Sequence, residues 1–297
     1  MSAVPSSPVF RFAPSPNGAL HLGHAYSALL NEKLARETDG RLLLRIEDID
    51  QTRCTPALEA QMIADLAWLG LDFTPPHRRQ SDHFDDYQQA LDRLIGRGLA
   101  YPAFMSRGDI RAWISDQERA TGKPWPRDPD GAPIYPALDR HLSASEREAR
   151  IAAGVPFAWR LDMAAALAMV GPDLSWVESG QGPSGEHGII VADPGAWGDV
   201  MLARRDTPTS YHLSVVVDDA LQGVSDVVRG RDLFFATAIH RLLQHLLSLP
   251  APRYHHHRLI LGDDGTKLSK SKGDEGIAAL RNAGIDPVTI RNELGFR

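Results

Sequence analysis

The sequence predicts an α/β fold in which a mostly parallel sheet is split by a long insertion. Apolar strand-like segments alternate with amphipathic helix-like segments near the start of the chain and again from residue 199 onward, a pattern typical of parallel sheets. Residues 101–200 are instead rich in proline, glycine and charge. We therefore expect an insertion there, with loops at 124–138 and 179–188.

The elements of the first half can be taken in chain order. Residues 9–13 predict a short strand, and the proline- and glycine-containing turn after it leads into a helix at about 23–38. A buried strand is expected at 41–48 and an amphipathic helix at 55–70. A further helix is expected at about 82–97.

The second half resumes the alternation of apolar segments after the insertion. Such segments occur at 199–205, 211–221 and 224–230. They are followed by a predicted helix at 231–249 and a predicted strand at 253–261.

These elements predict a chain of four parts. Residues 9–100 and 199–262 are expected to form the two halves of one α/β domain, and 101–198 an inserted α/β subdomain. Residues 263–297 are expected to form a lysine-rich loop and a short helical tail.

Composition narrows the class of protein. With 297 residues, 43% of them hydrophobic and 24% charged, the chain is typical of a soluble globular protein. No apolar run approaches the roughly 20 residues of a membrane span, and the N-terminus lacks the features of a secretory signal, so a cytoplasmic location without membrane contact is expected. The single cysteine, Cys54, excludes an internal disulfide and a Cys-rich zinc knuckle. A net charge of −6 argues against nonspecific coating of nucleic acid but permits a local basic face.

The stretch LHLGHA at 20–25 carries the first candidate site. A turn delivers His21 and His24 to the start of a helix, where backbone N–H groups and the helix dipole favour an anion such as phosphate. Gly23 lets a flat group such as adenine approach the backbone. Two histidines at this spacing can also simply cap a helix or face solvent, and a metal site lacks an evident third ligand.

The stretch KLSKSKG at 267–273 carries the second candidate site. Lys267, Lys270 and Lys272, with Ser269 and Ser271, lie on a glycine-flanked loop suited to closing over a polyphosphate. Alone, such a loop is equally typical of a solvated surface. The conjunction of the two stretches at opposite ends of a split sheet favours the phosphate interpretation.

HLGH and KLSKS resemble the two signature motifs of class I aminoacyl-tRNA synthetases, and RFAPSPNGALHLGHA, LRIEDID, YHLSVVVDDAL and VVRGRDL resemble the glutamyl branch. The resemblance covers about 9–100 and 199–273. It implies a Rossmann-like, parallel-sheet catalytic domain, with the insertion lying where this branch carries its acceptor-end-binding domain. It also implies that glutamate is joined to AMP and then passed to an RNA hydroxyl.

Glutamate carries two carboxylates and one ammonium, so a selective pocket needs two cationic forks and an anion. Arg11 and Arg229 can supply the forks, and Glu47, at the carboxyl end of a strand, suits the ammonium. Which arginine holds which carboxylate stays open. By resemblance, three more residues complete the glutamate pocket: Ala13, Ser15 and Tyr211.

The resemblance implies that the residues of the HLGH and KLSKS motifs bind ATP and act on its phosphates. Glutamate attacks the α-phosphate as an ionised carboxylate, so the first step needs no general base. The catalytic residues are expected to be His21, His24, Lys267 and Lys270, and ATP is expected to bind at His21, Gly23, His24 and Lys270. ATP is a substrate, and Mg²⁺ is expected to arrive with it. No metal site of the protein itself is predicted.

Residues 273–297 are too few for a further domain with its own core. This layout resembles the glutamyl-queuosine tRNA(Asp) synthetases, which attach glutamate to the modified base queuosine in the anticodon of tRNA(Asp). The implied partners are queuosine-bearing tRNA(Asp), L-glutamate and ATP, and a monomer is expected. Alternatives are a truncated glutamyl-tRNA synthetase charging a tRNA 3′ end, a small nucleotidyltransferase that makes a dinucleotide, and a non-catalytic synthetase-like protein that binds tRNA or regulates a partner.

Members of this family commonly bind zinc in the insertion through three cysteines and a tyrosine. The aligned positions here hold Ala103, Met105, Tyr135 and Asp139. An alanine methyl and a methionine thioether cannot replace thiolates, so no zinc is expected. The region is expected to be held by packing of four other residues: Pro102, Phe104, Pro136 and Leu138.

Two further groups have open interpretations. The histidine run at 255–257 cannot readily converge on one metal ion, because successive strand residues point to opposite faces, and partly exposed strand histidines are expected. Arg53, Arg78 and Arg79, together with the basic residues of the insertion, are candidates for an RNA-facing surface, with solvated surface as the alternative.

Overall fold

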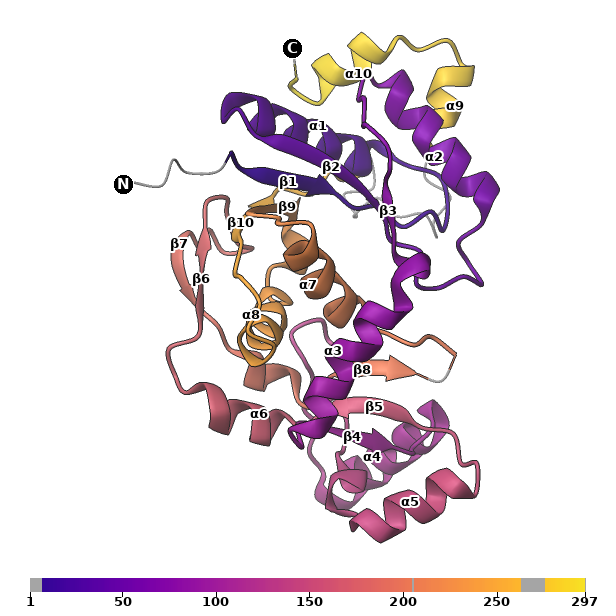
Figure 1. The fold of residues 1–297 in the computed structure, drawn as a ribbon, viewed down its shortest axis with the longest axis vertical. Coiled ribbons are helices and arrows are strands. Elements are labelled where there is room, and N and C mark those ends of the chain that lie inside the picture. The colour runs from indigo at the N-terminus through magenta and orange to yellow at the C-terminus, as the bar shows by residue number, and fades with distance from the viewer. Residues whose placement is uncertain (1–6, 205, 263–275, 297) are drawn as a thin grey trace.

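The computed structural model describes residues 7–204, 206–262 and 276–296. Its helices and strands follow in chain order (Figure 1): β1 (Val9–Phe12), α1 (Leu22–Glu37), β2 (Arg41–Ile46), α2 (Pro56–Trp68), β3 (Arg78–Arg79), α3 (Phe84–Gly96), β4 (Ala100–Ala103), α4 (Arg107–Thr121), α5 (Ala144–Ala152), β5 (Ala158–Leu161), α6 (Met163–Val170), β6 (Ser175–Glu178), β7 (Gly188–Val191), β8 (Met201–Arg204), α7 (Tyr211–Leu221), β9 (Asp226–Gly230), α8 (Thr237–Leu246), β10 (Arg253–His257), α9 (Ile277–Asn282) and α10 (Pro287–Glu293).

The larger sheet is mostly parallel, as predicted. Its strand order is β3-β2-β1-β9-β10-β6-β7, and every neighbouring pair is parallel except β6 and β7. Phe12 of β1 pairs with Leu44 of β2, while Phe10 pairs with Asp226 of β9. The chain therefore runs outward in opposite directions from β1 and β9. This boundary is a topological switch point, where open α/β sheets bind their ligands.

The smaller sheet is antiparallel, with the order β4-β5-β8. Figure 1 places it with α4 and α5 at one end of the molecule, opposite α9 and α10. The two sheets divide the chain differently from the expected ranges. Strands β6 and β7, from the range 101–198, belong to the larger sheet, and β8, from 199–262, belongs to the smaller one.

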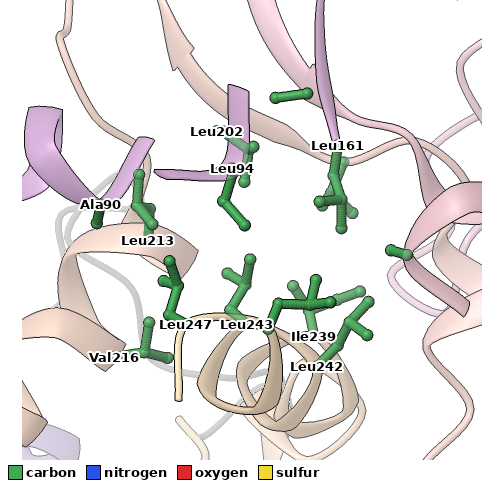
Figure 2. Close-up of a cluster of buried hydrophobic side chains, with 14 of the residues drawn as sticks. Ala90, Leu94, Leu161, Leu202, Leu213, Val216, Ile239, Leu242, Leu243 and Leu247 are labelled. Carbon is green, nitrogen blue, oxygen red and sulfur yellow. The ribbon is translucent and has the colours of Figure 1, made fainter. Parts of the chain in front are cut away.

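A shared core joins the insertion to the rest of the chain. Figure 2 shows leucines from β5 and β8, both in the smaller sheet, meeting leucines from α3, α7 and α8 in one buried cluster. Leu161 of β5, Leu202 of β8 and Leu243 of α8 are each 0% exposed. The insertion is therefore packed through its strands against helices of both halves. The cluster includes Leu94, Leu161, Leu202, Leu213 and Leu243.

The turn from α1 into β2 depends on a glycine. Asp39 takes a φ of 51°, and Gly40 donates its N–H to Ala35 O at 2.7 Å. A Cβ on Gly40 would lie 2.7 Å from the carbonyl oxygen of Pro8. Only glycine therefore lets the chain return beside β1.

The predicted helix at 231–249 is shorter in the structure. Residues 231–233 form a 3₁₀ turn, and the α-helix begins only at Thr237. The Leu233 carbonyl oxygen accepts a hydrogen bond from the Arg229 guanidinium at 3.2 Å, so it is directed toward that side chain. The predicted strand at 253–261 ends at His257, because its partner strand β9 ends opposite it at Gly230.

The last helices pack on the first half of the chain. Ile277 of α9 and Ile290 of α10 join a buried cluster with Leu29, Met62 and Leu66. The Ile277 N–H also donates to the carbonyl oxygen of Leu20, beside the HLGH stretch, at 2.7 Å. The segment after the lysine-rich stretch is thereby fixed to the start of the chain. Within the described ranges, no helix is both long and apolar enough to cross a membrane.

Replacing Leu243 by alanine is expected to lower the free energy of unfolding by about 2–5 kcal/mol, because it empties space in the shared core. The matched control is Leu221→Ala, since Leu221 is 59% exposed at the end of α7. Urea denaturation of both variants measures the difference. Equal losses would contradict the view that this core holds the smaller sheet to α3, α7 and α8.

Candidate active site

A cavity of about 810 Å³ opens at the carboxyl ends of β1, β2 and β9, at the switch point of the sheet. Parallel strands place their following residues at one edge, so segments distant in sequence meet there. The cavity brings together each predicted glutamate or nucleotide residue that lies in the described ranges: Arg11, Ala13, Ser15, His21, Gly23, His24, Glu47, Tyr211 and Arg229. Lys267 and Lys270 lie outside the described residues.

His21 and His24 form the start of α1. The His21 Nδ1 accepts from the Gly23 N–H at 3.1 Å, and the His24 Nδ1 accepts from the His21 N–H at 3.1 Å. The two rings lie 3.8 Å apart. Because both Nδ1 atoms accept, each neutral ring carries its hydrogen on Nε2. The motif therefore caps the helix and also presents two imidazole N–H donors at its positive end.

Gly23 has a steric role beside His21. A Cβ at this position would lie 3.0 and 3.1 Å from ring atoms of His21. A larger residue would require the His21 ring to shift by a few tenths of an ångström. The glycine thus preserves the arrangement of the two histidines, in addition to lining the cavity.

A buried ion network lies directly behind the cavity. Asp219 of α7 accepts from Arg11 Nε at 3.1 Å and from Arg45 Nη1 at 2.7 Å. Arg45, which is 0% exposed, also donates to Glu47 Oε1 from Nε and Nη2, at 3.3 and 3.2 Å. Burial raises the pKa of Glu47, although Arg45 and Arg11 oppose the shift. This network fixes one predicted arginine and the predicted carboxylate of the site.

The adjacent Asp218 has a structural role. It accepts from Arg78 Nε at 2.6 Å, from Gln80 Nε2 at 2.7 Å and from the Tyr87 hydroxyl at 2.9 Å. Arg78 is thus a structural residue, which corrects its candidacy for an RNA-facing surface. Arg79 is likewise paired with Glu59, whereas the Arg53 side chain is 66% exposed and pairs with Asp50 at 2.7 Å.

Arg229 does not offer the two-pronged fork that the sequence predicted. Its guanidinium is bonded from behind by a histidine cluster and a threonine. On the cavity side, Nη1 lies 3.4 Å from the Tyr211 hydroxyl. At this part of the cavity wall, Arg229 therefore contributes one guanidinium nitrogen, next to the phenol group of Tyr211. Burial also raises the pKa of Tyr211, which keeps the hydroxyl protonated.

The histidine run at 255–257 is more buried than expected. His256 is 1% exposed and His257 is 7% exposed, while His255 is partly buried and contacts the Ser179 hydroxyl at 3.1 Å. His256 binds Glu178 at 2.6 Å. His257 lines the cavity, and among the described residues its Nε2 has no hydrogen-bond partner. The predicted partial exposure fits His255 but was wrong for His257 and for His256, whose partner Glu178 lies on a strand distant in sequence.

A second cavity of about 470 Å³ adjoins the first. It shares Arg53 and Tyr211 with it and extends toward the insertion. On the insertion side, the Arg160 guanidinium lies 3.9 Å from the centre of the Tyr135 ring. Trp197 and His212 also line this space. The two cavities together connect the switch point with the inserted sheet.

The four positions aligned with zinc ligands lie close together. Ala103 and Tyr135 belong to a small apolar cluster against which Met105 packs. The Tyr135 hydroxyl donates to Asp139 Oδ2 at 2.6 Å. The predicted packing by Leu138 was wrong, since that side chain is 43% exposed. A tyrosine–carboxylate hydrogen bond and apolar contacts organise the region.

Sequence reasoning missed the residues that support the site from behind. Arg45, Asp219 and Glu178 touch predicted site residues or their partners, yet none was singled out. The signal was a charged residue inside an otherwise apolar strand or helix, as in RLLLRIED and SVVVDDAL. Such a residue is rarely buried unless paired.

The buried histidines predict a pH dependence of stability. Burial lowers the pKa of both His212 and His256 to about 4, from an ordinary value of 6.5. Only the unfolded chain takes up these protons between pH 6.5 and 4. The contribution of these two histidines to the free energy of unfolding should therefore be fully present above pH 6.5. It should fall toward pH 4, by up to about 1.4 kcal/mol per pH unit for each histidine.

Urea denaturation between pH 7.5 and 4.5 measures this slope. His212→Gln should make it shallower, whereas His187→Gln, at an exposed position, should leave it unchanged. An identical slope in His212→Gln and the parent chain would contradict the assignment.

The comparisons with known proteins agree with this geometry. The sequence profile described as "tRNA synthetases class I (E and Q), catalytic domain" matches residues 9–297. The chain is 45% identical to the glutamyl-Q tRNA(Asp) synthetase of Rhodobacter capsulatus, over 97% of this chain and 100% of that one. It is 40% identical to the glutamyl-Q tRNA(Asp) synthetase of Symbiobacterium thermophilum, over 96% and 85%.

Glutamate–tRNA ligases are more distant and longer. The chain is 36% identical to that of Aquifex aeolicus, over 96% of this chain and 56% of the ligase. The crystal structure of a glutamate tRNA ligase from Elizabethkingia meningosepticum, in complex with its amino acid, matches with a TM-score of 0.72 at 26% identity, over 91% of this chain and 53% of that one. The chain thus spans about half the length of these ligases. It belongs to the class I tRNA synthetases of the E and Q branch, a family of ligases, and has the Rossmann-like catalytic domain of that family.

Proposed function

We propose that this chain activates L-glutamate with ATP to glutamyl-AMP and transfers the glutamate to queuosine in the anticodon of tRNA(Asp). The supporting observation is one cavity that brings Arg11, Arg229 and Glu47 together with a histidine-capped helix start. These groups suit the two carboxylates and the ammonium of glutamate beside a phosphate.

In the proposed complex, Arg11 and Arg229 bind the two carboxylates of glutamate, and Glu47 binds its ammonium. Because Arg45 bonds Glu47 Oε1, we assign the ammonium to Oε2. A bound ammonium favours the ionised carboxylate and opposes the burial that raises the pKa of Glu47. Ala13, Ser15 and Tyr211 complete the wall around the substrate.

The activation step needs alignment and charge rather than a base. The glutamate carboxylate attacks the α-phosphorus of ATP, the bond to the bridging oxygen breaks, and pyrophosphate leaves. The Nε2–H groups of His21 and His24, at the positive end of α1, stabilise the phosphate charge, and Gly23 allows the nucleotide to approach. We assign Lys267 and Lys270 to the same charge. Among the described residues no group of three His, Cys, Asp or Glu is placed to bind a metal, and we assign Mg²⁺ to the phosphates of ATP.

The transfer step uses the second cavity. A hydroxyl of the acceptor nucleoside attacks the carbonyl carbon of glutamyl-AMP, an ester forms, and AMP leaves. We place this nucleoside between the catalytic residues and the insertion, because the second cavity shares Tyr211 and Arg53 with the first. Its aromatic and cationic lining, including Tyr135 and Arg160, suits a nucleobase.

The choice of acceptor rests on similarity. Identity to the two glutamyl-Q tRNA(Asp) synthetases is 45% and 40%, against 36% for the glutamate–tRNA ligase of Aquifex aeolicus. The alternative acceptor is the 3′ end of a tRNA, which the 36% identity also supports. We further propose a cytoplasmic monomer.

We also propose that the insertion holds no zinc at positions 103, 105, 135 and 139. An alanine, a methionine and a tyrosine already hydrogen-bonded to Asp139 do not fit a zinc donor set. Elemental analysis of the purified chain is expected to find far less than one zinc per molecule. One zinc per chain, lost on Asp139→Asn, would contradict the proposal.

The proposed reaction predicts a specific labelling pattern. With ATP, Mg²⁺ and labelled glutamate, tRNA(Asp) that carries queuosine should become labelled, while tRNA(Asp) without queuosine and tRNA(Glu) should not. Labelling of tRNA(Glu) would instead support the alternative acceptor. No labelling of any tRNA would remove the transfer step from the proposal.

The lysine stretch supplies a matched pair of variants for this assay. Lys270→Ala is expected to reduce glutamate-dependent pyrophosphate exchange by about a hundredfold, because it removes charge from the activation step. Lys272→Ala, two positions along the same stretch, should have a smaller effect. Equal activities in the two variants would contradict the role assigned to Lys270.

A further inference from the structure

Arg229 is held in one orientation by its own hydrogen bonds. A guanidinium has five N–H donors and no acceptor. Four of the five donate to protein atoms other than the Tyr211 hydroxyl. Nε donates to His256 Nε2 at 3.1 Å, Nη2 to Thr237 Oγ1 at 2.8 Å and to Leu233 O at 3.2 Å, and Nη1 to His240 Nδ1 at 3.0 Å.

These bonds fix the tautomer of the histidine behind the arginine. Because Arg229 can only donate, His256 Nε2 must accept and cannot carry a hydrogen in this arrangement. The ring hydrogen therefore lies on Nδ1, which donates to Glu178 Oε2 at 2.6 Å. A carboxylate that orients a histidine in this way sets which nitrogen faces its next partner.

The Glu178 carboxylate accepts hydrogen bonds at both of its oxygens. It is 2% exposed on β6, and β6 pairs with β10 next to the histidine. Oε1 accepts from the backbone N–H groups of His256 and Gly180, at 2.8 and 2.9 Å. Oε2 accepts from the His256 ring and from Trp176 Nε1 at 3.3 Å. Both oxygens face donors only, so the site requires a carboxylate rather than an amide.

We infer that Glu178 and His256 are positioning residues that set glutamate affinity through Arg229. This inference rests on the proposed function, in which Arg229 binds a carboxylate of the substrate. The Glu178–His256 pair holds the guanidinium so that its fifth N–H, on Nη1, donates to the Tyr211 hydroxyl at 3.4 Å at the cavity. The substrate carboxylate is then recognised by this guanidinium N–H and by the phenol O–H, whose mutual position does not depend on the ligand.

Glu178→Gln tests this directly. The glutamine amide must place its NH₂ against donors on one side or the other. If NH₂ faces the ring, His256 must accept at Nδ1 and carry its hydrogen on Nε2, directed at the Arg229 Nε–H. We expect the Kd for glutamate and the KM for glutamate in pyrophosphate exchange to rise about tenfold or more, with the KM for ATP within about twofold of the parent.

The matched control is Glu186→Gln, because Glu186 is a partly buried carboxylate between β6 and β7 whose Oε2 accepts the nearby backbone N–H of Ser184 at 2.8 Å. It should leave both KM values unchanged. Thermal unfolding of the two variants separates a loss of affinity from a loss of fold.

A second pair covers the case in which Glu178→Gln does not fold. His256→Gln keeps an acceptor near the position of Nε2 and should bind glutamate more tightly than His256→Leu.

The possible outcomes distinguish a failure of this inference from a failure of the proposed function. If the parent chain binds no glutamate by calorimetry, the proposed function fails, and this inference fails with it. If the parent binds glutamate and Glu178→Gln binds it equally well, the positioning role alone is overturned. Equal affinity in His256→Gln and His256→Leu would overturn it as well.

Discussion

The carboxylate of Asp219 is the interaction on which the site depends. It lies on α7 in the second half of the chain and binds Arg11 and Arg45 from β1 and β2 in the first half. Although burial alone would raise it, the two arginines hold the pKa of Asp219 below its ordinary value. Losing one partner of such a buried network typically costs about 3–5 kcal/mol, because charges are left unpaired. The two halves of the domain are therefore joined by charge as well as by apolar packing.

The network also decides which groups are available to a substrate. Asp218 and Asp219 are consecutive, yet their hydrogen-bond partners differ: Asp218 accepts from Arg78 and Tyr87, and Asp219 accepts from the cavity-lining Arg11 and from Arg45. Arg45 completes the arrangement by binding one oxygen of Glu47. Because these charges are balanced within the protein, the cavity can present Arg11 and Glu47 at fixed positions before any ligand arrives. Preorganisation of this kind reduces the ordering that binding must impose.

The sequence could predict the parallel sheet, and that the candidate site residues of the described ranges lie together at one edge of it, because both follow local rules. Strand ends place Arg11, Glu47 and Arg229 at one edge whenever neighbouring strands are parallel. The supporting contacts follow no local rule. Strand β6 pairs with β10 across some 75 residues of chain, and nothing near Glu178 or His256 in the sequence indicates the other. The histidine run was for this reason taken as partly exposed, and β6 and β7 were assigned to the insertion rather than to the larger sheet.

The hairpin of β6 and β7 has a consequence for how the sheet keeps its alignment. Successive strand residues face opposite sides, and on β6 the buried Glu178 follows Val177, which is 48% exposed. If β6 slipped by one residue against β10, a valine would replace the carboxylate beside His256, and the imidazole would lose its acceptor. Two buried side chains thus distinguish the correct pairing from the neighbouring one. Near the edge of the sheet farthest from the HLGH helix, the Glu178–His256 contact thus favours the correct strand register.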